Sequence, residues 1–194
     1  MIDLSRMLDT ESPAAYRTYN RITWMSPKIM DRFNAAMLLI FEHAGTHVDA
    51  PNHLVSVGKP TIEDTSLRQW MGDCCVLHMG EMDPGGLVSK NDIIQWQEEY
   101  GEINEEDVVL FDFKWPSGWC CNRYDVKYNQ NPGISEEAAK YLVSKGVKLI
   151  GCDVPAVDSY RDEQSLAHEV ILSNRVGLLE NLANLELLPP KGAF

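Results

Sequence analysis

The sequence predicts an α/β protein in which a single domain, residues 1–194, holds a mixed sheet core flanked by helices. The second half of the chain alternates expected helices and strands, and the first half adds short apolar strands to the same core. The length of 194 residues suits one domain and is ample for burying a core.

Two strands are expected in the first half of the chain. Ala35–His43 (AAMLLIFEH) is short and apolar, which is typical of a buried strand. Gly45–Pro60 is rich in Gly, Thr, Asp, Asn and Pro, so we expect a loop there. Cys74–Met79 (CCVLHM) is the next apolar run and predicts a second strand.

The second half predicts the alternation itself. Ser89 is expected to cap a helix over Lys90–Tyr100, with Asp92 in the first turn, where the helix dipole favours a negative charge. Asp107–Phe113 (DVVLFDF) predicts a strand, and Trp115–Pro132 predicts a long irregular stretch. The remaining expected elements are a helix from Ser135 to Gly146, a strand over Val147–Asp153, a helix near Glu163–Ser173 and a strand over Val176–Leu182.

Composition excludes several classes of partner. The net charge of -12 disfavours nucleic acid, because the phosphate backbone would be repelled. The longest apolar stretch is far too short to span a bilayer, which needs about 20 residues. The N-terminus lacks a basic start followed by an apolar run, so we expect no signal peptide and a cytoplasmic location.

The five cysteines do not predict a disulfide or zinc framework. They are two adjacent pairs, Cys74–Cys75 and Cys120–Cys121, and Cys152, with no C-x-x-C spacing. Free thiols in or near the core are the favoured interpretation. A redox role is the weaker one, because adjacent cysteines bond to each other only with strain.

The stretch HAGTHVDAPNH carries the chemistry: it places His43, His47, Asp49 and His53 within 11 residues. Gly45 and Pro51 oppose a helix, and in an extended backbone residues two apart point to the same side. His47 and Asp49 are therefore expected to converge. His43 reaches the same point if Gly45 lets the chain turn, and His53 returns to it beyond Pro51.

Imidazole and carboxylate together are a ligand set for Zn²⁺ or a similar divalent ion such as Mn²⁺. A catalytic zinc keeps a position open for water and lowers the pKa of that water to about 7, which supplies hydroxide at neutral pH. A chance polar loop is the alternative, but four ligand-type side chains in so short a stretch favour a metal site. A lone histidine such as His78 is instead expected to be structural.

The cluster resembles the H-x-G-T-H-x-D-x-P-x-H signature of the cyclase-like metal-dependent hydrolases, the family of bacterial kynurenine formamidase and isatin hydrolase. Further segments are similar to family motifs in the same order along nearly the whole chain. They are Asp3-Leu-Ser5, Pro132-Gly-Ile-Ser135, Gly151-Cys-Asp153-Val-Pro-Ala-Val-Asp158, and His168 followed by Leu179-Glu180-Asn181. The resemblance implies the swivelling β/β/α fold of that family and a homodimer or larger homo-oligomer.

The resemblance also implies roles for single residues. His43, His47 and Asp49 would hold a first ion, and His168 and Glu180 would help to bind a second in two-zinc members. His53 would be the proton donor and acceptor. Taken without the resemblance, His168 is expected on a helix surface and Glu180 at a strand edge. An acid inside the apolar run Val176–Leu182 is nonetheless unexpected, because burying an unpaired carboxylate is costly.

The expected reaction is hydrolysis of an amide-type bond in a small molecule, of the arylformamidase (N-formylkynurenine) class. Opening of a cyclic lactam or lactone is the alternative reaction, and a non-catalytic metal-binding homologue is the alternative class. Departures from the family bear on the substrate: the W-P-G-D-like patch is missing, and Leu54 stands where phenylalanine is usual. Candidates for stacking on a planar substrate are Tyr16, Trp24, Trp115, Trp119 and Tyr124, with core packing as the alternative.

Overall fold

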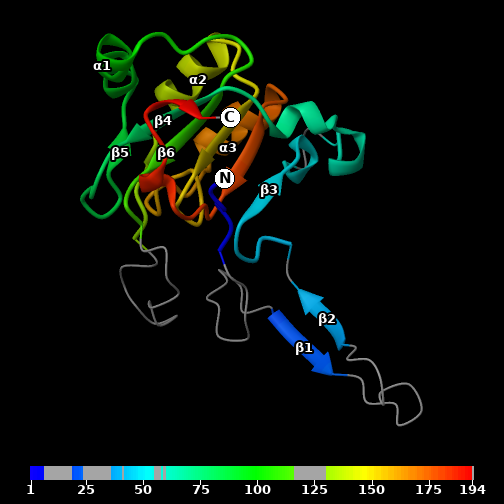
Figure 1. The fold of residues 1–194 in the computed structure, drawn as a ribbon. Helices are drawn as coiled ribbons and strands as arrows, with labels where there is room; N and C mark the ends of the chain where they lie inside the picture. The colour runs from blue at the N-terminus through cyan, green and yellow to red at the C-terminus, as the bar shows by residue number, and fades with distance from the viewer. Residues whose placement is uncertain are drawn as a thin grey trace.

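The computed structural model describes residues 1–6, 19–23, 36–40, 42–54, 58, 60–115 and 130–193. Figure 1 shows a twisted sheet with helices packed beside it, and a separate two-stranded hairpin, β1–β2, that lies apart from this body. The strands are β1 Tyr19–Thr23, β2 Ala36–Ile40, β3 His47–Asp49, β4 Cys74–His78, β5 Leu87–Val88, β6 Val108–Asp112, β7 Gly133–Ile134, β8 Leu149–Cys152, β9 Gly177–Glu180 and β10 Lys191–Ala193. The α-helices are α1 Lys90–Tyr100, α2 Glu136–Ser144 and α3 Leu166–Ser173.

The main sheet has six strands in the order β10-β4-β6-β8-β9-β3. The four inner strands β4, β6, β8 and β9 run parallel, whereas β10 and β3 pair antiparallel at the two edges. This arrangement confirms the predicted α/β class with a mixed sheet. Because the inner strands are parallel, their carboxyl ends meet at one edge of the sheet, where α/β proteins bind ligands.

Both faces of the sheet are buried, as is usual for parallel strands. Along β4, Cys75 and Leu77 belong to one core cluster, and Cys74 and Val76 belong to another. The first cluster contains the buried side chains of α1, α2 and α3, so all three helices cover the same face. The second is closed by Trp70, Leu185 and neighbouring leucines, which cover the opposite face without an α-helix.

Local capping explains where the helices begin. Ser89 Oγ accepts a hydrogen bond from the backbone N of Asp92, and Asp92 Oδ2 accepts one from the backbone N of Ser89 at 2.7 Å. Ser135 Oγ accepts from the backbone N of Ala138 at 3.1 Å. Each pair satisfies N–H groups that lack partners within the helix. The predicted helices over 90–100 and 135–146 are therefore confirmed.

The predicted strands over 74–79, 107–113, 147–153 and 176–182 are confirmed as β4, β6, β8 and β9, and the helix near 163–173 is confirmed as α3. The expectation for Ala35–His43 is wrong in one respect. Its strand, β2, pairs with β1 and not with the main sheet, and Ile40 is 44% exposed. The expected loop over Gly45–Pro60 contains a short strand, β3, because its backbone pairs with β9.

Most of the irregular stretch expected over Trp115–Pro132 lies outside the described residues. None of the helices in the described ranges combines the length and the apolar character needed to cross a membrane.

Candidate metal centre

The candidate centre is built where β3 meets β9 at the edge of the main sheet. His47 lies directly opposite Glu180, and Asp49 lies opposite Leu178. Leu178 belongs to the core cluster that contains the helices, so the side chains of His47, Asp49 and Glu180 face the helix-covered side of the sheet. The intervening residue, Val48, points to the other side and is exposed.

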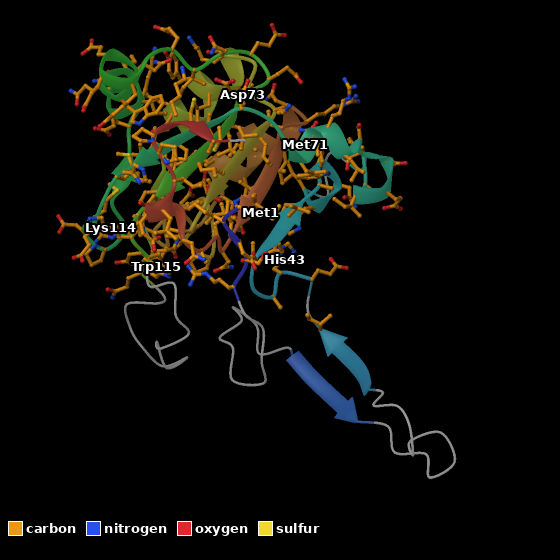
Figure 2. All side chains as sticks on the ribbon, in the orientation of Figure 1. Met1, His43, Met71, Asp73, Lys114 and Trp115 are labelled. Atoms are coloured by element: carbon orange, nitrogen blue, oxygen red, sulfur yellow. The ribbon has the colours of Figure 1, made fainter. Side chains whose placement is uncertain are left out.

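His43 joins this group because the chain turns sharply at Gly45, which has a φ of 66°. Glycine adopts this left-handed conformation without a steric penalty. The turn brings His43 Nδ1 to 2.9 Å from His47 Nε2. In Figure 2, His43 lies on the lower side of the body with Lys114 and Trp115, whereas Asp73, which precedes β4, lies toward the upper side. The centre thus occupies the carboxyl end of the sheet.

Three donor atoms surround one point. His43 Nδ1 is 2.9 Å from His47 Nε2 and 3.1 Å from Asp49 Oδ1, and His47 Nε2 is 3.7 Å from the same oxygen. A tetrahedral ion with bonds of about 2.0 Å places its ligand atoms about 3.3 Å apart. The three observed separations scatter around that value, so these atoms form a face that fits a small divalent cation.

A second group shares Asp49 with the first. His168 Nε2 is 3.7 Å from Asp49 Oδ2 and 3.3 Å from Glu180 Oε1. Glu180 Oε2 in turn is 3.5 Å from His47 Nε2. The two oxygens of each carboxylate therefore face different imidazoles, which is the arrangement of carboxylates able to bridge two neighbouring ions.

Contacts behind the histidines fix the direction of their rings. His47 Nδ1 is 2.8 Å from the carbonyl oxygen of Gly45, so this nitrogen donates and Nε2 is the one that faces the centre. His168 Nδ1 is held in the same way by a short hydrogen bond to Asp158 Oδ2. A carbonyl or carboxylate behind the ring is the usual means of selecting the tautomer of a metal-binding histidine.

Electrostatics in the centre oppose the effect of burial. Asp49 and Glu180 are each 3% exposed, and burial disfavours a charged carboxylate. The neighbouring imidazoles of His168 and of His43 or His47 outweigh burial and hold both carboxyl pKa values below their ordinary range. Conversely, burial lowers the pKa of His47 and of His168, but hydrogen bonds to carboxylates raise both pKa values above the ordinary value. For His47, the hydrogen bond to the backbone of Gly45 raises the pKa further.

The surroundings of one buried oxygen atom indicate whether a cation fits the centre. Asp49 Oδ2 is inaccessible to solvent and has no hydrogen-bond partner among the described residues. An unpartnered carboxylate oxygen is costly to bury, and a cation would remove that cost. The donor set of three imidazoles and two carboxylates is chemically suited to Zn²⁺ or Mn²⁺. The residues present therefore fit a divalent cation.

His53 lies at the same centre, and one of its ring nitrogens is within 4.8 Å of ligand atoms of His43 and Asp49. It ends the 3-10 helix Pro51–His53, is exposed, and places its ring 4.3 Å from the His43 ring and 6.1 Å from the His168 ring, measured between centroids. Burial of part of the ring lowers the pKa of His53, which favours the neutral form that can accept a proton. Its position suits a residue that exchanges protons with a molecule bound at the centre.

The other predicted residues fall in different places. The proposed stacking residues Tyr16, Trp24, Trp119 and Tyr124 lie outside the described residues, whereas Trp115 packs against the core cluster that contains the helices. His78 lies at the end of β4, where its Nδ1 is 2.7 Å from Asp112 Oδ2, in keeping with a structural role.

The three described cysteines are free and buried. Burial raises the pKa of Cys74 and of Cys75 to about 12, and raises that of Cys152 well above its usual range, so these thiols are poor nucleophiles. Cys120 and Cys121 lie outside the described residues.

Sequence reasoning missed two contributors to the centre. Asp158 orients His168, and Arg6 binds the backbone beside Glu180 and at the end of β8. Arg6 binds acceptors far away in the chain, and no local pattern marks it. Asp158 ends a segment that resembles a family motif, ten residues before His168, but no role was predicted for it from the sequence.

Most of the chain matches a known protein family. The family model described as "Putative cyclase" matches residues 2–159. Kynurenine formamidase from Bacillus cytotoxicus is 30% identical over 141 residues, which are 72% of this chain and only 60% of that relative. Kynurenine formamidase from Bacillus thuringiensis is 26% identical over 189 residues, which cover 93% of this chain and 81% of the relative.

Solved structures share the fold. A crystal structure of an isatin hydrolase bound to the product analogue thioisatinate superposes with a TM-score of 0.87 at 22% identity, over 98% of this chain and 82% of the other. Isatin hydrolase A from Labrenzia aggregata gives a TM-score of 0.88 at 20% identity, over 98% and 83% of the two chains.

Proposed function

The chain belongs to the cyclase family, and from this premise we propose that it is a metal-dependent hydrolase that opens an amide-type C–N bond in a small molecule. The observation that carries the proposal is the unpartnered Oδ2 of the buried Asp49, set among imidazoles and a second buried carboxylate. A site that binds a cation explains this arrangement, whereas a purely structural cluster leaves the oxygen without a hydrogen bond.

In this proposal His43, His47 and Asp49 would hold one ion, and His168 and Glu180 would help to hold a second. Zn²⁺ and Mn²⁺ are the candidates for the ion. When bound, such a cation lowers the pKa of a coordinated water to about 7 and polarises a carbonyl group.

The chain's own residues supply positioning and proton transfer. Gly45 and Asp158 hold the rings of His47 and His168 so that a fixed nitrogen of each faces the centre. His53, on the open side, takes a proton from the attacking water and delivers it to the leaving nitrogen. Proton transfer of this kind contributes about 10² to 10⁴ in rate.

The relatives indicate the class of substrate. One relative is named as a formamidase and one solved structure as a hydrolase of isatin, and formamides and isatin both contain an amide-type C–N bond. We propose the arylformamide as the first candidate, because the relatives with the higher sequence identity carry that name. Hydrolysis of a panel containing N-formylkynurenine, isatin and simple lactones, with Zn²⁺ and with Mn²⁺, distinguishes the candidates.

The variant His53→Ala tests the assigned chemistry. We expect kcat to fall by about 10² to 10⁴ while the metal content of the purified protein stays at the level of the unchanged chain. Asn52→Ala is the matched control, because Asn52 is exposed in the same 3-10 helix. Retained turnover in His53→Ala contradicts the assigned role. A chain that binds metal but hydrolyses nothing in the panel supports a non-catalytic homologue instead.

A further inference from the structure

Arg6 is a buried cation that binds three segments remote from it in the chain. Its residue is only 7% exposed, although arginine is almost never buried unless it is paired. Nε donates to the carbonyl oxygen of Asn181 at 3.1 Å, and Nη2 donates to that of Asp153 at 2.7 Å. The backbone N–H donates to Thr46 Oγ1 at 2.8 Å. Arg6 therefore forms hydrogen bonds with three separate segments of the chain.

Two of these three partners adjoin candidate ligands in sequence. Thr46 immediately precedes His47, and Asn181 immediately follows Glu180. Asp153 follows the last residue of β8, the strand that neighbours β9. Arg6 thus binds the Thr46 hydroxyl beside His47 and the backbone carbonyl of Asn181 beside Glu180.

The carbonyl oxygen of Asn181 is the common anchor. It accepts from Arg6 Nε and also from Thr46 Oγ1 at 2.6 Å. Asn181 has a φ of 56°, the left-handed conformation that asparagine adopts more readily than most residues other than glycine. The two donors on its carbonyl oxygen fix the direction of the backbone directly after a candidate ligand.

We propose that Arg6, together with the Thr46 hydroxyl, is a positioning device that holds His47 and Glu180 at the spacing a divalent cation requires. This inference rests on the proposed function, because it assumes that the centre binds a cation. Arg6 is a positioning residue and not a catalytic one, since it acts through the backbone on either side of the ligands.

The geometry also explains why arginine occupies this position. The two acceptors, on Asn181 and Asp153, are reached by different nitrogens of one planar guanidinium. Lysine offers donors from a single point and cannot reproduce this fork. We therefore expect Arg6→Lys to keep the positive charge and lose the positioning.

The test measures the affinity of the full-length chain for Zn²⁺ and Mn²⁺ by competition with a chromophoric chelator. Arg6→Lys and Thr46→Val each remove part of the device, and Thr46→Ser restores the hydroxyl. Arg68→Ala is the matched control, because Arg68 is exposed on a 3-10 helix. We expect affinity to fall by about 10- to 100-fold in the first two variants, as is typical when support behind metal ligands is lost. Thr46→Ser and Arg68→Ala should stay close to the unchanged chain.

Thermal melts in excess chelator separate positioning from general stability. If Arg6 and Thr46 position the ligands, Arg6→Lys and Thr46→Val weaken cation binding at temperatures where both variants are still fully folded. If the role of these residues is purely structural, the substitutions lower only the melting temperature. Cation affinities of these two folded variants within twofold of the unchanged chain overturn the inference alone. An unchanged chain that binds no divalent cation overturns the proposed function, and this inference with it.

Discussion

The hydrogen bond from His168 to Asp158 makes Asp158→Asn an informative substitution. Asp158 is buried, and its two oxygens have different tasks. Oδ1 accepts from the backbone N of Ala167 at 2.8 Å and of His168 at 3.4 Å, at the beginning of α3. Oδ2 accepts from His168 Nδ1. An asparagine that keeps its oxygen toward the helix N–H groups must turn its NH₂ group toward the imidazole.

The substitution therefore reverses the neutral tautomer of His168. Nδ1 becomes the acceptor and only Nε2 carries a hydrogen, which points toward Glu180 Oε1 at 3.3 Å and Asp49 Oδ2 at 3.7 Å. The metal-free protein tolerates this change because Nε2–H finds carboxylate acceptors. A cation does not, since a protonated nitrogen cannot be a ligand. We expect affinity for the ion beside His168 to fall by about 10- to 100-fold, or about 1.4–2.7 kcal/mol.

A calorimetric titration with the metal ion measures this loss of affinity. The ion that His43, His47 and Asp49 are proposed to hold should bind Asp158→Asn nearly as tightly as it binds the unchanged chain. Asp162→Asn is the matched control, because Asp162 Oδ2 accepts from the backbone N of Leu166, also at the beginning of α3, without contacting His168. If Asp158→Asn takes up the second ion with the affinity of the unchanged chain, the tautomer argument is refuted.

Two further predictions follow from the same region. In chelator, the pKa values of His47 and His168 lie above the ordinary value of 6.5, so the stability they contribute is complete below pH 6.5 and is lost as pH rises through the raised values. We expect the melting temperature in chelator, followed by scanning fluorimetry, to fall above pH 6.5 and to recover with a divalent cation; a flat profile would contradict this. In Gly133→Ala, the new Cβ would lie 2.2 Å from the backbone N of Ser159 and 2.5 Å from the carbonyl carbon of Asp158. We expect a loss of at least about 1–3 kcal/mol in unfolding free energy, measured in urea; Gly72→Ala, which meets mainly the flexible end of Lys148, should cost less, and equal losses would refute the packing argument.

Elements with local determinants were predictable from the sequence. The beginning of α1 depends on Ser89 and Asp92, three residues apart, and the prediction of that helix was confirmed. The three-residue strand β3 was not predictable, because Gly, Asp and Pro around it indicate a loop and its pairing with β9 lies about 130 residues away in the chain. The strand β10 depends in the same way on pairing with β4.

The residues of the candidate centre also differ in whether the local sequence could predict them. His43, His47, Asp49 and His53 lie in one short segment, so their convergence follows from backbone geometry. His168 and Glu180 come from other elements, and only a family resemblance suggested them. Arg6 was not suggested at all, because its donors reach acceptors 147 and 175 residues away. Contacts of that kind leave no periodic pattern in a sequence.

The charges of the centre explain how the same fold can exist with and without a cation. Asp49 and Glu180 are buried acids, and in the metal-free protein protons on His47 and His168 balance them. A cation has to displace those protons, because a protonated imidazole has no lone pair to offer. Cation binding must therefore release protons and weaken as pH falls. The hydrogen bonds that keep the metal-free centre folded are thus the ones with which a cation competes, so any variant that strengthens them should stabilise the metal-free chain and weaken its affinity for metal.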